Sequence, residues 1–326
     1  MKDLKRKILE AVNRDLEAIE EALKANLNPH LDLVSRIAGH ILFSGGKRLR
    51  PLLVVLGARM CGYRGDFGPT SSVIFEYLHA ATLVHDDIID GASMRRGEPV
   101  AHSIWGNPAA VLVGDFLLAR SISLSARTKN SKIISVVADI TENMSQGEIH
   151  QLMKRGDIDL TEEEYYEVVR RKTAILFRGA CKVSALLADA PQSWERALAD
   201  YGLHMGMAFQ MIDDVLDYTP DTRVWGKGAG ADIREGKLTL PVIAALKSAD
   251  NRDRRLIEKM ISRQDFSEKE FQNFIELLER YDGIAYTRRR AAGYVQQARE
   301  AIMTFEPSET RETLLDVADY ALVRKV

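Results

Sequence analysis

The sequence predicts an all-α fold, a single-domain bundle of roughly ten or more helices over residues 1–326 around a deep central cavity. Apolar residues recur at three- and four-residue spacing along most of the chain, and neither strand alternation nor a hairpin turn stands out. Two D-D-x-x-D clusters, starting at Asp86 and Asp213, must converge if they share a ligand. Length alone suggests about two domains, but this convergence favours one.

Periodicity places the helices in chain order. Residues 2–27 have the amphipathic pattern of a helix at the solvent edge. Pro51 suits the first turn of a helix that is apolar on all sides and therefore buried, and Thr161 with Glu164 forms a capping signature. We expect helices over 2–27, 30–43, 51–62, 72–90, 108–127, 131–154, from 161 onward and over 193–218, with helical spacing again from 252 to the end.

Composition excludes several classes of function. The chain has 45 basic and 47 acidic residues and a net charge of −2, so nothing global indicates nucleic acid or an anionic membrane as a partner. Cys61 and Cys181 lack CxxC spacing, which predicts reduced core thiols in a cytoplasmic protein. The basic N-terminus continues into an amphipathic helix without the apolar region of a signal peptide. The apolar runs 51–58 and 109–119 are too short or interrupted for a transmembrane segment.

The two acidic clusters predict a metal site. Asp86 and Asp90 lie one helical turn apart, with about 5–6 Å between their Cβ atoms. Carboxylates grouped in an apolar segment persist only beside water, cations or metal. Oxygen ligands without paired His or Cys favour Mg²⁺, or Mn²⁺, over zinc. The candidate metal ligands are Asp86, Asp87, Asp90, Asp213, Asp214 and Asp217.

Cationic residues near these clusters outnumber what neutralisation requires, which indicates diphosphate ligands, two of them on our interpretation. The turn 44–51 reads as an anion cradle or simply as a basic helix connection. Arg95 and Arg96 fit bidentate phosphate recognition better than pairing with the aspartates. His79 is a candidate phosphate donor, while His85 is equally well explained as a core residue. The candidate cations are Lys47, Arg50, Arg95, Arg96, Lys172, Lys227 and Lys237, the last two in or beside a long glycine-rich loop.

The chain resembles the trans-isoprenyl diphosphate synthases, the polyprenyl synthetase family, and within it the long-chain, octaprenyl-type enzymes. The likeness covers nearly the whole length and keeps the family's motif order. Val100 departs from the Thr that many relatives have there, and this puts nothing catalytic in doubt. The matching segments are 46–51, 83–90, 95–97, 114–117, 146–148, 172–174, 209–217 and 236–241.

The resemblance implies a reaction and a role for each motif residue. Three Mg²⁺ ions on Asp86, Asp90 and Asp213, supported by Asp87, Asp214 and Asp217, would clamp an allylic diphosphate. Departure of the diphosphate leaves an allylic cation, the isopentenyl double bond attacks it, and the released diphosphate takes the proton. The allylic diphosphate would contact Arg95, Lys172, Thr173, Gln210, Lys227 and Lys237, whereas isopentenyl diphosphate would contact Gly46, Lys47, Arg50, His79 and Arg96.

The residues before Asp86 bear on product length. In this family, side chains one and two turns before the first aspartate wall off the growing hydrocarbon. Ala81 and Thr82 are small here, so we expect a long all-trans product of about seven to ten isoprene units, as in quinone side-chain synthases. A side chain farther from Asp86, at Leu78, Phe75 or in residues 131–154, would form the floor of the product cavity and set the final length.

Other functions stay open at this stage. A shorter-chain farnesyl or geranylgeranyl synthase differs only in that floor. A class I terpene cyclase also uses D-D-x-x-D, but its second metal motif differs and it has no use for the cradle at 45–50. A subunit of a heteromeric synthase would usually have lost aspartates. Homodimers are usual among relatives, and transient membrane contact for product release is compatible with the sequence.

Overall fold

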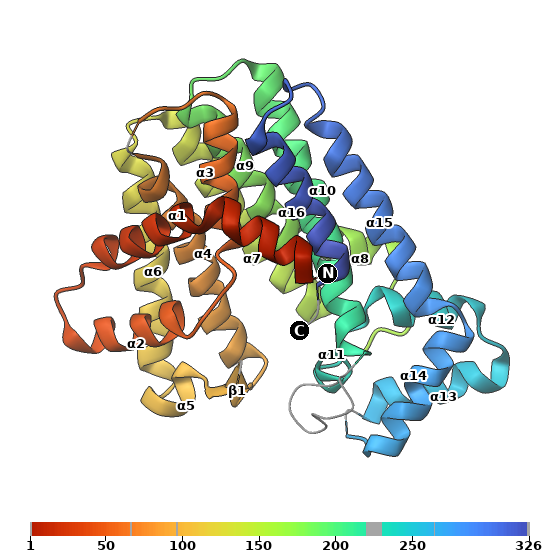
Figure 1. Cartoon of the computed structure of the whole chain (residues 1–326). Helices are drawn as coiled ribbons and strands as arrows, with labels where there is room; N and C mark the ends of the chain where they lie inside the picture. The colour runs from red at the N-terminus through yellow and green to blue at the C-terminus, as the bar shows by residue number, and fades with distance from the viewer. Residues whose placement is uncertain (1, 66, 96, 220–229, 264, 325–326) are drawn as a thin grey trace.

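The computed structural model describes residues 2–65, 67–95, 97–219, 230–263 and 265–324. Within these ranges the chain is helical apart from connections and one hairpin of two-residue strands, so the predicted all-α fold is confirmed (Figure 1). The hairpin pairs Met94 with Pro99 and Arg95 with Glu98. Sequence analysis missed it because two residues carry no alternation pattern.

The first half of the chain supplies the helices that carry the first acidic cluster. α4 is buried along most of its length and ends at that cluster. The elements are α1 (Lys2–Leu27), α2 (Asp32–Phe43), α3 (Leu49–Met60), α4 (Phe67–Ile89), β1 (Met94–Arg95), β2 (Glu98–Pro99), α5 (Ala101–Trp105), α6 (Asn107–Arg127) and α7 (Ser131–Met153).

The second half begins with the predicted capping box, in which Thr161 and Glu164 bond reciprocally. α10 carries the second acidic cluster at its C-terminal end. The elements are α8 (Glu162–Val169), the π-helical turn η1 (Arg170–Ala174), α9 (Ile175–Leu187), α10 (Gln192–Asp217), α11 (Ala231–Arg234), α12 (Leu240–Ser248), α13 (Asn251–Arg263), α14 (Glu268–Arg280), α15 (Gly283–Ala301) and α16 (Glu309–Val323).

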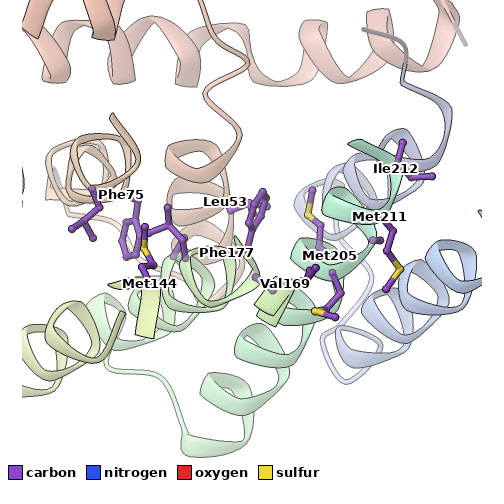
Figure 2. Packing of buried hydrophobic residues seen from close by; sticks show 14 of the residues in the cluster. Leu53, Phe75, Met144, Val169, Phe177, Met205, Met211 and Ile212 are labelled. Carbon is purple, nitrogen blue, oxygen red and sulfur yellow. The ribbon is translucent and has the colours of Figure 1, made fainter. Parts of the chain in front are cut away.

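The core lies between α4, α10 and the long helices that pack against them. α4 packs against α6 and α3, while α10 packs against α9 and α15. Leu53, Phe75, Met144 and Phe177 come from four different helices and belong to one apolar cluster (Figure 2). The C-terminal ends of α4 and α10 lie toward the same end of the bundle (Figure 1). This packing brings the two acidic clusters toward one another.

The π-helical turn η1 gives the backbone an extra residue at Lys172 and Thr173. π-turns interrupt α-helices and recur at functional sites. Gly147 of α7 packs directly on this turn, since a Cβ there would lie 2.7 Å from the backbone N of Lys172. The glycine therefore allows α7 to approach η1 closely.

Candidate active site

The first acidic cluster occupies the last turn of α4, and each of its carboxylates contacts a cation. Asp87 is buried and accepts from Arg95 Nε at 2.9 Å. Asp90 accepts from Lys237 Nζ at 2.8 Å and also pairs with Arg155. The Lys172 Nζ lies 3.8 Å from Asp86 Oδ2.

The second cluster, on the last turns of α10, has three carboxylates in three different environments. Asp213 pairs with Arg324 at 2.6 Å. Asp214 is buried, where Tyr165 Oη donates to it at 2.5 Å and Gln210 Nε2 at 2.9 Å. Asp217 accepts backbone N–H bonds from residues 231 and 232 and so caps α11. Asp214 is buried, whereas Asp213 and Asp217 are half-buried.

Two lysines connect the clusters electrostatically. Burial raises the pKa of Asp86 in the first cluster, and the positive charges of Lys172 and Lys237 partly offset that rise. The same two lysines act on Asp232, whose carboxyl group also experiences the negative charge of Asp213 in the second cluster. Through Asp232, the two clusters therefore border one charged region.

Burial raises the pKa of several of these carboxyl groups. It raises that of Asp86 to about 6 and that of Asp214 to about 8. Burial raises the pKa of Asp213 as well, although Arg324 opposes the shift. Burial also acts to raise the pKa of Asp90, but Lys237, Lys172 and Arg155 together outweigh it and the net shift is downward. A positive charge placed near a buried carboxyl group with a raised pKa stabilises the ionised form of that group.

The donor set fits a hard divalent cation, because its side-chain oxygens are carboxylates and Mg²⁺ prefers such ligands. Among the described residues, however, no group of three or more His, Cys, Asp or Glu side chains is arranged to hold a metal. Ion pairs account for the lack of such a group in the described part of the chain. Arg155, Lys237 and Arg324 contact the same carboxylates that a metal would use.

A cavity of about 120 Å³ opens beside these groups, between α7, α8, η1, α10 and the segment after α11. In its wall, Thr173 Oγ1 donates to Gln210 Oε1 at 2.8 Å. This volume is below the roughly 300–1,000 Å³ of typical small-molecule sites, so substrates require rearranged side chains. The lining residues are Gln151, Lys154, Leu160, Tyr165, Val168, Val169, Lys172, Thr173, Gln210, Asp214, Asp232, Lys237, Leu238 and Thr239.

The basic turn before α3 faces the second cluster. The positive charges of Lys47 and Arg50 both lower the pKa of Asp213, which burial raises. The Arg50 guanidinium lies 4.5 Å from the centroid of the Phe177 ring. Gly46 lies in this turn, and His79 is half-buried on α4.

Some predicted residues are not brought to the cavity. Ala81 and Leu78 are buried on α4, and Thr82 Oγ1 donates to the carbonyl of His79 in its own helix. None of the three lines the cavity described above. Arg96 and Lys227 fall outside the described residues.

Sequence reasoning missed several members of the site. Arg155 and Arg324 contact the acidic clusters but stand outside the motifs, at the ends of α7 and α16. Asp232 joins the second cluster from α11. The one feature of the sequence that could have identified Asp232 as a site residue is its position in the glycine-rich segment, between Gly230 and Lys237.

The chain is similar to known proteins in sequence and in fold. Residues 31–278 match the family model "Polyprenyl synthetase". Octaprenyl diphosphate synthase of Escherichia coli is 36% identical over 98% of each chain, and a short chain isoprenyl diphosphate synthase of Methanothermobacter thermautotrophicus is 36% identical over 95% of each. A crystal structure of polyprenyl synthase from Caulobacter crescentus, complexed with calcium and isoprenyl diphosphate, superposes with a TM-score of 0.93 at 36% identity, covering 98% of both chains. This chain therefore belongs to the polyprenyl synthetase family of prenyltransferases.

Proposed function

We propose that the protein condenses isopentenyl diphosphate with an allylic diphosphate in a Mg²⁺-dependent reaction and makes a long-chain all-trans polyprenyl diphosphate, a quinone side-chain precursor. The main support is the position of Lys172 and Lys237, which contact Asp86 and Asp90 of the first cluster and act on Asp232 beside the second. Both lysines line a cavity whose wall also includes Thr173 and Gln210. A diphosphate in that place would contact cations from several separate segments. The allylic carbon chain would need the side chains around this cavity to rearrange, because its volume is only about 120 Å³.

The metal would be held by Asp86 and Asp90 on one side and Asp213 on the other, with Asp87, Asp214 and Asp217 in support. We propose three Mg²⁺ ions, with Mn²⁺ as a substitute. When bound, the metal neutralises the charge that develops on the departing diphosphate. Binding requires that Lys237 and Arg155 release Asp90 and that Arg324 release Asp213. These cations can then pair with the diphosphate oxygens.

The chain's own residues position both substrates. Arg95, Lys172, Lys237 and Lys227 hold the allylic diphosphate, while Gly46, Lys47, Arg50, His79 and Arg96 hold isopentenyl diphosphate. The allylic C–O bond breaks and a C–C bond forms from the isopentenyl double bond. The proton lost from the resulting cation passes to the released diphosphate. The Thr173 hydroxyl and Gln210 amide, bonded at 2.8 Å, present oxygen dipoles to the cation.

Product length is the finer part of the proposal. The two relatives named above are equally similar but carry long-chain and short-chain names, so identity does not decide it. Small Ala81 and Thr82 favour a long product. Phe75 favours a shorter one, because it lies eleven residues before Asp86, about 16 Å along the helix axis. There it meets α9, where a Cβ on Gly179 would lie 3.5 Å from the Phe75 ring.

We propose that residues 1–326 form one domain and that two copies of the chain form a homodimer through α6. α6 is long and apolar enough by composition to cross a membrane, yet it packs on α4 along one side. Its other side exposes Val111, Leu112 and Ile122, an apolar face suited to a second copy. The free thiols of Cys61 and Cys181 suit a cytoplasmic location, with transient membrane contact on product release.

Radiolabelled isopentenyl diphosphate with allylic primers of increasing length tests the proposal. Mg²⁺-dependent products should extend the primer by several isoprene units, and chromatography against standards gives their length. A short, fixed product would replace the long-chain proposal with the farnesyl or geranylgeranyl alternative. Consumption of the primer without isopentenyl diphosphate would instead identify a cyclase.

A further inference from the structure

Arg48, the middle cation of the basic turn 45–50, points away from the acidic clusters. Its side chain is only 6% exposed. Nε donates to Glu20 at 2.5 Å, Nη1 to Glu76 at 2.7 Å and Nη2 to the carbonyl of Leu42 at 2.5 Å. One buried guanidinium thus joins α1, the end of α2 and α4 to the start of α3.

The backbone of Arg48 is itself unusual. Its φ of 45° and ψ of 32° are left-handed, a conformation that side chains other than Gly adopt at an energetic cost. Arg48 is also the N-cap of α3, and its carbonyl accepts from the Leu52 N–H at 3.0 Å. A strained conformation persists where surrounding contacts fix it. The three hydrogen bonds of the guanidinium hold the backbone of Arg48 in this conformation.

The direction of this turn determines where its two neighbours point. Lys47 precedes the left-handed residue directly, and Arg50 lies in the first turn of the helix that Arg48 begins. The Arg50 guanidinium lies 4.5 Å from the centroid of the Phe177 ring, and the positive charges of Lys47 and Arg50 both reach Asp213. An ordinary β or right-handed conformation at Arg48 would redirect Lys47 and shift the start of α3.

We propose that Arg48 is a positioning residue for isopentenyl diphosphate: its buried guanidinium holds the left-handed turn that directs Lys47 and Arg50 at this substrate. The inference rests on the proposed function. Lysine cannot replace the arginine, because a single ammonium cannot hold two carboxylates and a carbonyl in one planar fork. Glu76, buried on α4, acts through Arg48 in the same way.

Steady-state kinetics of Arg48→Lys and Glu76→Gln test this role with both substrates varied. For Arg48→Lys we expect the KM for isopentenyl diphosphate to rise about tenfold or more, the effect of losing a charge-assisted hydrogen bond. Its kcat and its KM for the allylic primer should stay close to wild type. Glu76→Gln should give a smaller rise in the same direction. Arg280→Lys is the matched control, since it perturbs the 2.7 Å contact with Asp253 on helices remote from the turn.

Two results would overturn the role of Arg48. One is an unchanged KM for isopentenyl diphosphate in both variants, and the other is an equal change in KM for both substrates. If Arg48→Lys does not yield folded protein, Glu76→Gln decides by the same criteria. If wild-type protein fails to elongate any primer, the proposed function is what has failed. Calorimetric titration of wild type and both variants with isopentenyl diphosphate then decides whether Arg48 supports binding of this ligand.

Discussion

Gly147 offers a sharp test of how the active site is built. In Gly147→Ala the new Cβ would lie 2.7 Å from the backbone N of Lys172 and 2.9 Å from the Cβ of Arg171. Ordinary contacts to such atoms are about 3.5–4.0 Å, so η1 must move by roughly 1 Å. Much of what it meets is backbone, which cannot rotate out of the way. Lys172 and Thr173 would therefore shift relative to Asp86 and Gln210.

A displacement of about 1 Å at reacting groups can cost as much as a hundredfold in rate. We expect kcat of Gly147→Ala to fall at least about tenfold, and stability to fall by about 1–3 kcal/mol from overpacking. Initial rates with saturating substrates and a thermal unfolding scan measure the two effects. The control is Gly293→Ala on α15, where a Cβ meets nothing within 4 Å and helix propensity predicts a gain of about 0.5–1 kcal/mol. Full activity and raised stability in both variants would refute the packing of α7 on η1.

Three further predictions follow from the site and its surroundings. Because burial raises the pKa of Asp86 to about 6, protons should compete with Mg²⁺ below that pH; calorimetry should show affinity falling as pH drops through 6, and a flat profile from pH 5 to 8 would contradict this. Ala81→Phe should shorten the product, because five residues of helix place the new ring only about 7.5 Å along the axis from Asp86. Phe75→Ala should lengthen the product if Phe75 limits it. Unchanged products in both variants would exclude α4 as the element that limits product length. Leu112→Asp on the exposed face of α6 should convert a dimer to monomer in sedimentation, and an unaltered mass would exclude this face.

Much of the fold was predictable because long, strongly periodic helices carry it. The helix at 2–27 and the capping box at Thr161 appear as expected. The π-helical turn at Lys172 was not predictable, because no local pattern in residues 170–174 indicates it and its close contact with Gly147 of α7 is long-range. The hairpin at Met94 was also missed, since it depends on four residues with no periodic pattern.

The sequence identifies the acidic motifs of the candidate site, but it does not show which groups contact each carboxylate. The family resemblance separates Asp213 from the supporting Asp214 and Asp217 without naming their partners. The structure gives them different partners, with Tyr165 and Gln210 on Asp214 and the start of α11 on Asp217. These partners come from elements far away in the chain. The role of Arg48 was likewise not predictable, because nothing in the run Lys47-Arg48-Leu49-Arg50 shows which of its cations is buried.

The most direct measurement is the product profile of the purified chain with isopentenyl diphosphate and an allylic primer, run in parallel with Mg²⁺ and with a chelator. If the two acidic clusters hold a metal-bound diphosphate, as proposed, elongated products should form only when Mg²⁺ and both substrates are present. Elongation that persists in chelator, or in Asp86→Asn and Asp213→Asn at wild-type rates, would contradict it.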